Sequence, residues 1–245
     1  METFPIPAPA FTGDSRSVSA GNAFEWLRRG WLAFMLDPGV WIAMTIIVFV
    51  IYFGLSIVPL LGQLAANLLT PLLVAGLLAA SRKAENGQTP EIPDLFAGFK
   101  TNSGELAVLG LLYMAGMLVI VAFVALLGGG SVAGGMMLGR PAGFGIAFGG
   151  MMLALLLSAL LSIPLVMAMW FAPALVLFNN MQPVPALKAS FNACLKNLLP
   201  FLIYGLIALV LAFFAALPLG LGFLVLVPVL AGSLHASYRD IFIAA

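Results

Sequence analysis

Charged residues are scarce in this chain. Only 8% of its 245 residues are Asp, Glu, Lys or Arg, and 63% are hydrophobic, whereas about a quarter of a soluble domain is charged. A soluble core of this size could not bury so much apolar surface, so the composition predicts an integral membrane protein. The net charge of +1 excludes a strong field that would attract nucleic acid.

The chain also has few of the residues on which enzymes and metal sites depend. Cys194 is its only cysteine, which excludes an internal disulfide, and His235 is its only histidine, which excludes a site built from several histidines. No phosphate-binding loop and no His-Glu-x-x-His motif occurs. We interpret His235 as a polar residue at a helix end, and we predict a non-enzymatic protein with no cofactor and no metal.

The first twenty residues lack the pattern of a signal peptide. They hold no basic segment followed by an apolar run, so we expect no cleavable signal. Pro, Ser and Ala are frequent here, which is typical of disorder. We therefore predict a disordered cytoplasmic tail over residues 1–20 and a single transmembrane domain over residues 21–242.

Long uncharged runs take the place of the missing charges. No Asp, Glu, Lys or Arg occurs in residues 38–81, 106–139, 141–187 and 197–238. Since a spanning helix needs about 20 apolar residues, each run holds one or two spans. This predicts an all-α integral membrane protein with six transmembrane helices in three hairpins. The predicted spans are about 40–61, 64–80, 106–127, 151–178, 198–217 and 219–237.

The positions of the basic residues predict the orientation of these spans. With six spans, every Lys and Arg except Arg140 falls on the face that also holds both termini. Basic residues accumulate in cytoplasmic loops, so this face is predicted to be cytoplasmic. Five spans would leave Arg239 on the opposite face. We therefore predict a multi-pass protein of the bacterial inner membrane with cytoplasmic N- and C-termini.

A short amphipathic stretch precedes each predicted hairpin. An aromatic residue stands six positions before the polar residue that opens each hairpin, namely Trp31, Phe96 and Phe191. Apolar and basic side chains lie on different faces of these stretches, which is typical of helices in the membrane interface. We therefore predict one short interfacial helix ahead of each hairpin.

The interfacial helices supply the candidate binding residues. Basic side chains beside a membrane surface attract anionic headgroups, and aromatic side chains favour the same depth. The predicted contacts are Trp26, Arg28, Arg29, Trp31, Phe96, Lys100, Lys188, Phe191 and Lys196. The leading hypothesis is an inner-membrane accessory or scaffold protein that binds anionic lipid at the cytoplasmic face, or a membrane-protein partner.

A second hypothesis concerns polar residues inside the second span. Asn67 lies near its middle, one turn from Thr70 and Pro71, and a helix broken there would free carbonyl groups of the kind transporters use. Interhelical hydrogen bonding explains Asn and Thr equally well, and we favour it because solute pathways normally contain a buried charge. A transporter or channel for a small neutral or amphipathic solute is therefore the alternative.

Glu91 and Asp94 allow a third, less favoured function, that of a lipid-modifying enzyme. They stand one helical turn apart in the polar segment 81–105 and could act as a general acid and base. Acidic residues also favour the first turn of a helix without any catalytic role, and this is the interpretation we prefer.

The segment 128–150 is rich in glycine. Several of its glycines are four residues apart, such as Gly130 and Gly134, a spacing that permits close helix contact. A flexible external loop would have the same composition. Met136, Met137 and Phe148 make the segment too apolar for a freely solvated loop, so we expect a packed or membrane-dipping connection.

Three segments carry a resemblance to a known family. Residues 94–100, 169–178 and 236–242 resemble an uncharacterised family of proteobacterial multi-pass inner-membrane proteins, over most of residues 21–242. The layout is distantly similar to the membrane domain fused to some bacterial glycerophosphodiesterases, but the catalytic domain is absent from this sequence. The resemblance implies a bacterial inner membrane and a six-helix fold, and it implies no reaction.

Overall fold

The structure of the protein is a computed structural model, which describes residues 11, 13–138 and 141–243. Arg140 and residues 1–10 of the predicted tail lie outside the described residues. The described part is helical, and its one β-type contact is an isolated bridge between Phe11 and Ile243. The all-α prediction is therefore confirmed.

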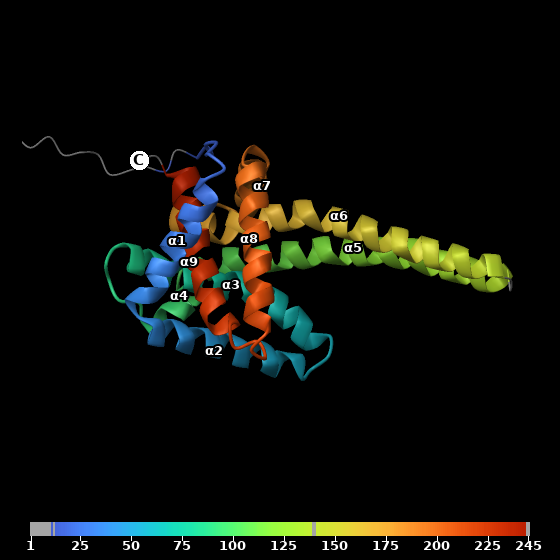
Figure 1. The fold of residues 1–245 in the computed structure, drawn as a ribbon, viewed down its shortest axis with the longest axis horizontal. Coiled ribbons are helices and arrows are strands. Elements are labelled where there is room, and N and C mark those ends of the chain that lie inside the picture. The colour runs from blue at the N-terminus through green and yellow to red at the C-terminus, as the bar shows by residue number, and fades with distance from the viewer. Residues whose placement is uncertain (1–10, 12, 139–140, 244–245) are drawn as a thin grey trace, which may run out of the picture.

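The helices follow one another with short connections (Figure 1). Their bounds are α1 Asn22–Leu36, α2 Pro38–Ser56, α3 Leu61–Glu85, η1 Ile92–Phe96, α4 Ala97–Lys100, α5 Ser103–Leu138, α6 Pro141–Asn179, α7 Pro183–Lys196, α8 Leu198–Ala216 and α9 Phe223–Phe242. Within the described residues, five of them are long and apolar enough to cross a membrane, namely α2, α3, α5, α6 and α8. The sixth predicted span coincides with α9, whose last turns hold Arg239 and Asp240 and which is not among these five.

The junction between α1 and α2 is determined by local hydrogen bonds. Asp37 has an extended, non-helical backbone, and its carboxylate accepts a hydrogen bond from the amide of Val40 at 3.1 Å. Pro38 follows at the first helical position, where a missing amide hydrogen has no cost. The indole of Trp41 reaches back and donates to the carbonyl of Ala33 at 2.9 Å. This junction fixes the angle between the two helices.

Two glycines let α1 and α9 cross closely. A side chain on Gly30 would overlap the carbonyl oxygen of Val229, and its Cβ would lie 2.8 Å from the amide nitrogen of Ser233. A Cβ on Gly232 would lie 2.8 Å from Cα of Gly30. The backbones therefore touch here, and this crossing brings Arg29, in the middle of α1, near the last turns of α9.

The hairpin of α5 and α6 is the most extended part of the molecule and continues beyond all other helices (Figure 1). The two helices contain 36 and 39 residues, which corresponds to about 54 and 58 Å. The glycine-rich segment 128–150 continues both helices up to the undescribed tip at residues 139–140. The described part of this segment is therefore helical and packed against itself across the hairpin, and the predicted spans 106–127 and 151–178 are shorter than the helices that contain them.

The main core lies at the opposite end of the molecule from the hairpin tip. Trp26 of α1, Phe171 of α6 and Phe242 of α9 are almost completely buried there, together with Tyr204 of α8. The ring of Trp26 packs against Phe201 and Tyr204 of α8 at centroid distances of 5.3 and 6.2 Å. The rings of Phe171 and Phe242 pack at 5.4 Å. This aromatic core holds the charged helix ends together.

Candidate functional site

A cluster of charged side chains joins three helices that are far apart in the sequence. Glu85 at the end of α3 forms an ion pair with Arg239 of α9 at 2.5 Å, and Arg29 of α1 lies 3.9 Å from the same carboxylate oxygen, Oε1. The other oxygen, Oε2, lies 2.9 Å from Nδ1 of His235. We refer to Arg29, Glu85, His235 and Arg239 as the Glu85 cluster.

His235 is buried beside Glu85 and two aromatic rings. Only 4% of its side chain is exposed, and the rings of Phe178 and Tyr238 pack against the imidazole at centroid distances of 5.6 and 6.3 Å. His235 is thus buried and paired, and its interpretation as a simple polar residue at a helix end is wrong.

Two cavities flank the Glu85–His235 pair. One, of about 440 Å³, is lined on its polar side by Arg29, Glu85 and His235 and on its apolar side by Leu32 and Leu36 of α1. The other, of about 370 Å³, is lined largely by polar residues. These are Arg82, Glu85, Asn86, Asn179, His235, Tyr238 and Arg239, with Phe11, Phe178 and Ile243. The pair therefore separates an amphipathic pocket from a polar one.

A second polar centre fixes the N-terminal segment to the end of α9. The carboxylate of Asp240 accepts hydrogen bonds from Arg16 at 2.8 Å, Asn22 at 2.6 Å and Trp26 at 3.0 Å. Burial alone would raise the pKa of Asp240, but these donors outweigh it, so that the pKa lies below its usual value. The charged form of Asp240 thus stabilises the contact between α1 and α9.

Asn197, at the start of α8, extends this contact. Its side-chain amide donates to the carbonyl of Arg16 at 3.0 Å, and its side-chain oxygen accepts from the amide of Val18 at 2.8 Å. Lys196 donates to the carbonyl of Ser15 at 3.0 Å. Part of the segment that was predicted as a disordered tail therefore lies against the ends of α7 and α9.

The predicted headgroup residues fall into three groups, which are buried, half-buried and exposed. Trp26 is 1% exposed and donates to Asp240, so the prediction that it contacts headgroups is wrong. Phe96 and Phe191 are half-buried. The amphipathic pattern thus identified most of the outward-facing residues but assigned Trp26 to the wrong face of its helix. The exposed members, as a headgroup contact requires, are Arg28, Arg29, Trp31, Lys100, Lys188 and Lys196.

The exposed basic residues also differ in their ion pairs. Arg28 and Arg29 both bind Glu25, at 2.7 and 3.0 Å, and the hydrogen bonds from Arg28 and Arg29 lower the pKa of Glu25 to about 2. Among the described residues, Lys100, Lys188 and Lys196 form no ion pair. These three lysines therefore have no carboxylate partner among the described residues, although the ammonium group of Lys196 donates to the carbonyl of Ser15.

Glu91 and Asp94 have a structural role in the segment before α5. Asp94 accepts from the amide of Glu91 at 2.8 Å, and both side chains cap η1 in a reciprocal capping box. Lys83 pairs with both, at 2.7 Å from Asp94 and 3.4 Å from Glu91. These contacts occupy the two carboxylates in binding η1 to the end of α3.

Asn67 and Thr70 line a cavity between α3, α5 and α6. Its volume is about 400 Å³, and Tyr113 and Trp170 form part of its wall. Thr70 is already hydrogen-bonded to Ala66 and Tyr52, both at 2.7 Å. The indole nitrogen of Trp170 is buried and has no hydrogen-bond partner among the described residues. α3 runs through Pro71 without interruption, so the predicted broken helix is absent at this site.

Sequence reasoning missed the Glu85 cluster because no local spacing connects its members. One signal was present, since His235 and Arg239 are four residues apart and hence share a helix face. Their partner Glu85 stands at the end of a different apolar run. Only the predicted meeting of those helix ends at one membrane face could have linked them.

Comparison with known proteins gives a relative whose sequence aligns with most of this chain. A probable inner membrane protein of Burkholderia thailandensis is 31% identical over 229 residues, which cover 89% of this chain and 82% of the relative. No family model matches the chain, and no solved structure matches it. The distant similarity to glycerophosphodiesterase membrane domains thus remains a prediction. The chain belongs to the same family of probable inner membrane proteins as this Burkholderia relative.

Proposed function

We propose that the protein is a non-enzymatic accessory protein of the inner membrane that binds anionic lipid headgroups at its cytoplasmic face. The observation that carries this proposal is the set of three exposed lysines that form no ion pair among the described residues, Lys100, Lys188 and Lys196. They lie on α4 and α7, which also carry exposed apolar side chains such as Phe99 and Leu195. Basic groups above an apolar surface match the chemistry of a phospholipid.

The proposal includes six spans with both termini in the cytoplasm. The Glu85 cluster joins the ends of α3 and α9, and Asp240 binds the segment before α1. These contacts favour a common membrane face for the N-terminus, the segment 86–102 and the C-terminus. The first half of α9 is apolar, and its polar groups are concentrated in its last turns, near that face. A sixth span therefore agrees with the distribution of charge.

Replacing Lys100, Lys188 and Lys196 together with Glu is expected to weaken binding of phosphatidylglycerol strongly. Each lysine near an anionic surface contributes about 1 kcal/mol, so the loss of three corresponds to an affinity change on the order of 100-fold. The measurement is native mass spectrometry of the detergent-purified protein during titration with phosphatidylglycerol.

Two controls accompany this measurement. Phosphatidylcholine has no net charge, and its retention should not change in the variant. Gln63→Glu adds a negative charge in the first turn of α3, at the end of the helix opposite to Glu85, and should leave phosphatidylglycerol binding intact. Equal retention of phosphatidylglycerol by parent and triple variant would refute the headgroup role.

A transporter or channel for a small neutral or amphipathic solute is the second candidate function. The cavity beside Asn67 and the unpartnered indole nitrogen of Trp170 favour it, because both offer polar contacts to a guest inside the helix bundle. In the described residues no Asp, Glu, Lys or Arg lines this cavity, and ion pathways normally contain such a group. We therefore give it second place.

Labelling of an Asn67→Cys variant separates the two functions. Under the accessory function, a membrane-impermeant maleimide added to either side leaves the introduced thiol unmodified, because water does not reach the cavity. Gln63 is exposed in the first turn of α3, so a Gln63→Cys variant should be modified and serves as the positive control. The parent chain, with only the buried Cys194, gives the background. Modification at position 67 would favour transport.

A further inference from the structure

The α5–α6 hairpin is longer than a bilayer is thick. From Glu105 to Leu138, α5 extends about 50 Å, whereas the hydrocarbon core measures about 30 Å. Even a helix tilted by about 40°, the upper end of the usual range, crosses that core in about 39 Å. On the order of 10–20 Å of hairpin therefore lies beyond the hydrocarbon region. This end of the hairpin carries no Asp, Glu or Lys, and its one charged residue is Arg140.

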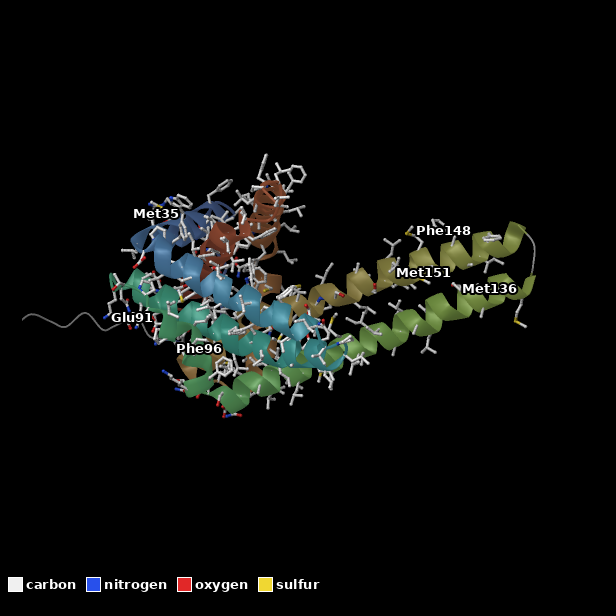
Figure 2. All side chains as sticks on the ribbon, turned by 90° about the horizontal axis from the view of Figure 1, so that it is seen from below. Met35, Glu91, Phe96, Met136, Phe148 and Met151 are labelled. Atoms are coloured by element: carbon white, nitrogen blue, oxygen red, sulfur yellow. The ribbon has the colours of Figure 1, made fainter. Side chains whose placement is uncertain are left out.

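The far part of the hairpin exposes large apolar side chains (Figure 2). Met136 and Met137 of α5 are 76 and 90% exposed, and Phe144 and Phe148 of α6 are 84 and 69% exposed. Each contributes roughly 150–200 Å², by comparison with the area that aromatic side chains bury. Together they present on the order of 600 Å² of apolar surface that no other described residue covers.

The contact between α5 and α6 does not use this surface. A side chain on Gly135 would overlap the carbonyl of Gly143, which shows that these glycines form the inner face of the hairpin. A Cβ on Gly134, Gly145 or Gly149 meets nothing within 4 Å. The outer face therefore alternates open hollows at glycines with the projecting methionine and phenylalanine side chains.

We infer that the hairpin ends of two membrane-inserted copies of this chain pack against each other beyond the hydrocarbon core. Two copies inserted in the same orientation are related by a two-fold axis along the membrane normal, so identical surfaces meet. Phe144 and Phe148 of one copy then fill the hollows at Gly145 and Gly149 of the other. The four exposed side chains of each copy would together bury about 1,200 Å², the lower limit for a stable interface. The result is a four-helix bundle beyond the lipid core.

A second copy fits this surface better than a partner recognised by charge. The described hairpin residues from 106 onward to 179 contain no charged side chain, so they offer no electrostatic basis for choosing a different protein. By contrast, the projecting side chains of Phe144 and Phe148 and the hollows at Gly145 and Gly149 lie on the same surface of the chain. Such self-complementarity is what an isologous contact requires.

Cross-linking in native membranes tests the inference with the full-length chain. In a Phe148→Cys variant, oxidation or a short bifunctional maleimide should give most of the protein as a dimer at twice 25.7 kDa. Phe213→Cys on α8 replaces an equally exposed ring, since Phe213 is 63% exposed, and should remain monomeric. The parent chain has only the buried Cys194 and supplies the background. Adding Gly149→Leu to the Phe148→Cys variant should lower the dimer yield several-fold.

Four results would overturn the inference. Coupling of the thiol at position 148 to a different protein would assign the surface to another partner. Absence of a dimer with ready modification by a membrane-impermeant maleimide would mean that water covers the surface. Absence of both dimer and modification would mean that lipid covers it. A dimer that forms equally well with Gly149→Leu would contradict the proposed fit at the glycines.

Discussion

Replacing Glu85 with Gln is expected to lower the free energy of unfolding by about 3 kcal/mol. Removing one partner of a buried ion pair costs about 3–5 kcal/mol because the remaining charge is left uncompensated. Since 23% of the Glu85 side chain and 38% of the Arg239 side chain are exposed, solvent screens this pair in part, and we expect no more than the lower end of this range. Arg239 would lose its carboxylate partner, and His235 would keep only a neutral acceptor. The thermal midpoint in detergent, followed by tryptophan fluorescence, should fall by roughly 10 °C.

A matched substitution separates the loss of the cluster from the loss of a carboxylate. Glu105, near the start of α5, forms no ion pair among the described residues, and Glu105→Gln should leave the thermal midpoint within about 2 °C. A double-mutant cycle with Arg239→Gln should show strong coupling to Glu85. Additive effects in this cycle would mean that the Arg239–Glu85 contact contributes no stability.

The predicted fold followed from the sequence where local chemistry and apolar length determine the outcome. Uncharged runs located the five membrane-capable helices of the described residues. The segment 128–150 was harder, because glycine normally weakens a helix. Contact between the inner faces at Gly135 and Gly143 compensates for this weakness, and such pairing across a hairpin cannot be read from a single sequence.

The candidate site was less predictable for a similar reason. Exposure of Lys100, Lys188 and Lys196 followed from the amphipathic pattern, since polar faces of short helices turn away from the core. The burial of Trp26 depended on Asp240, which is distant in sequence and supplies the acceptor for its indole. A polar handle that finds a buried partner allows a tryptophan to leave the membrane interface. Tertiary contact therefore overrode the local preference.

The crossing of α1 and α9 at Gly30 connects the Glu85 cluster with the contacts of Asp240. A substitution at Gly30 is therefore expected to disturb both polar centres. Arg29 of α1 belongs to the Glu85 cluster, and Asp240 of α9 accepts hydrogen bonds from Asn22 and Trp26 of α1. Both sets of contacts depend on the distance between these helices. If α1 moved outward, the ion pair, the indole hydrogen bond and the first cavity would all change together.

Gly30→Val is accordingly expected to prevent accumulation of the folded protein or to lower the free energy of unfolding by about 3 kcal/mol or more. The new Cβ would overlap the backbone carbonyl of Val229, and no change of rotamer can relieve a clash with backbone. Gly205→Ala is the control, because a Cβ at Gly205 in α8 meets nothing within 4 Å and alanine favours a helix by up to about 1 kcal/mol. Thermal unfolding of both variants in detergent should therefore shift in opposite directions, or remain unchanged for Gly205→Ala. A Gly30→Val protein with the parental midpoint would show that α1 and α9 are separated at this position.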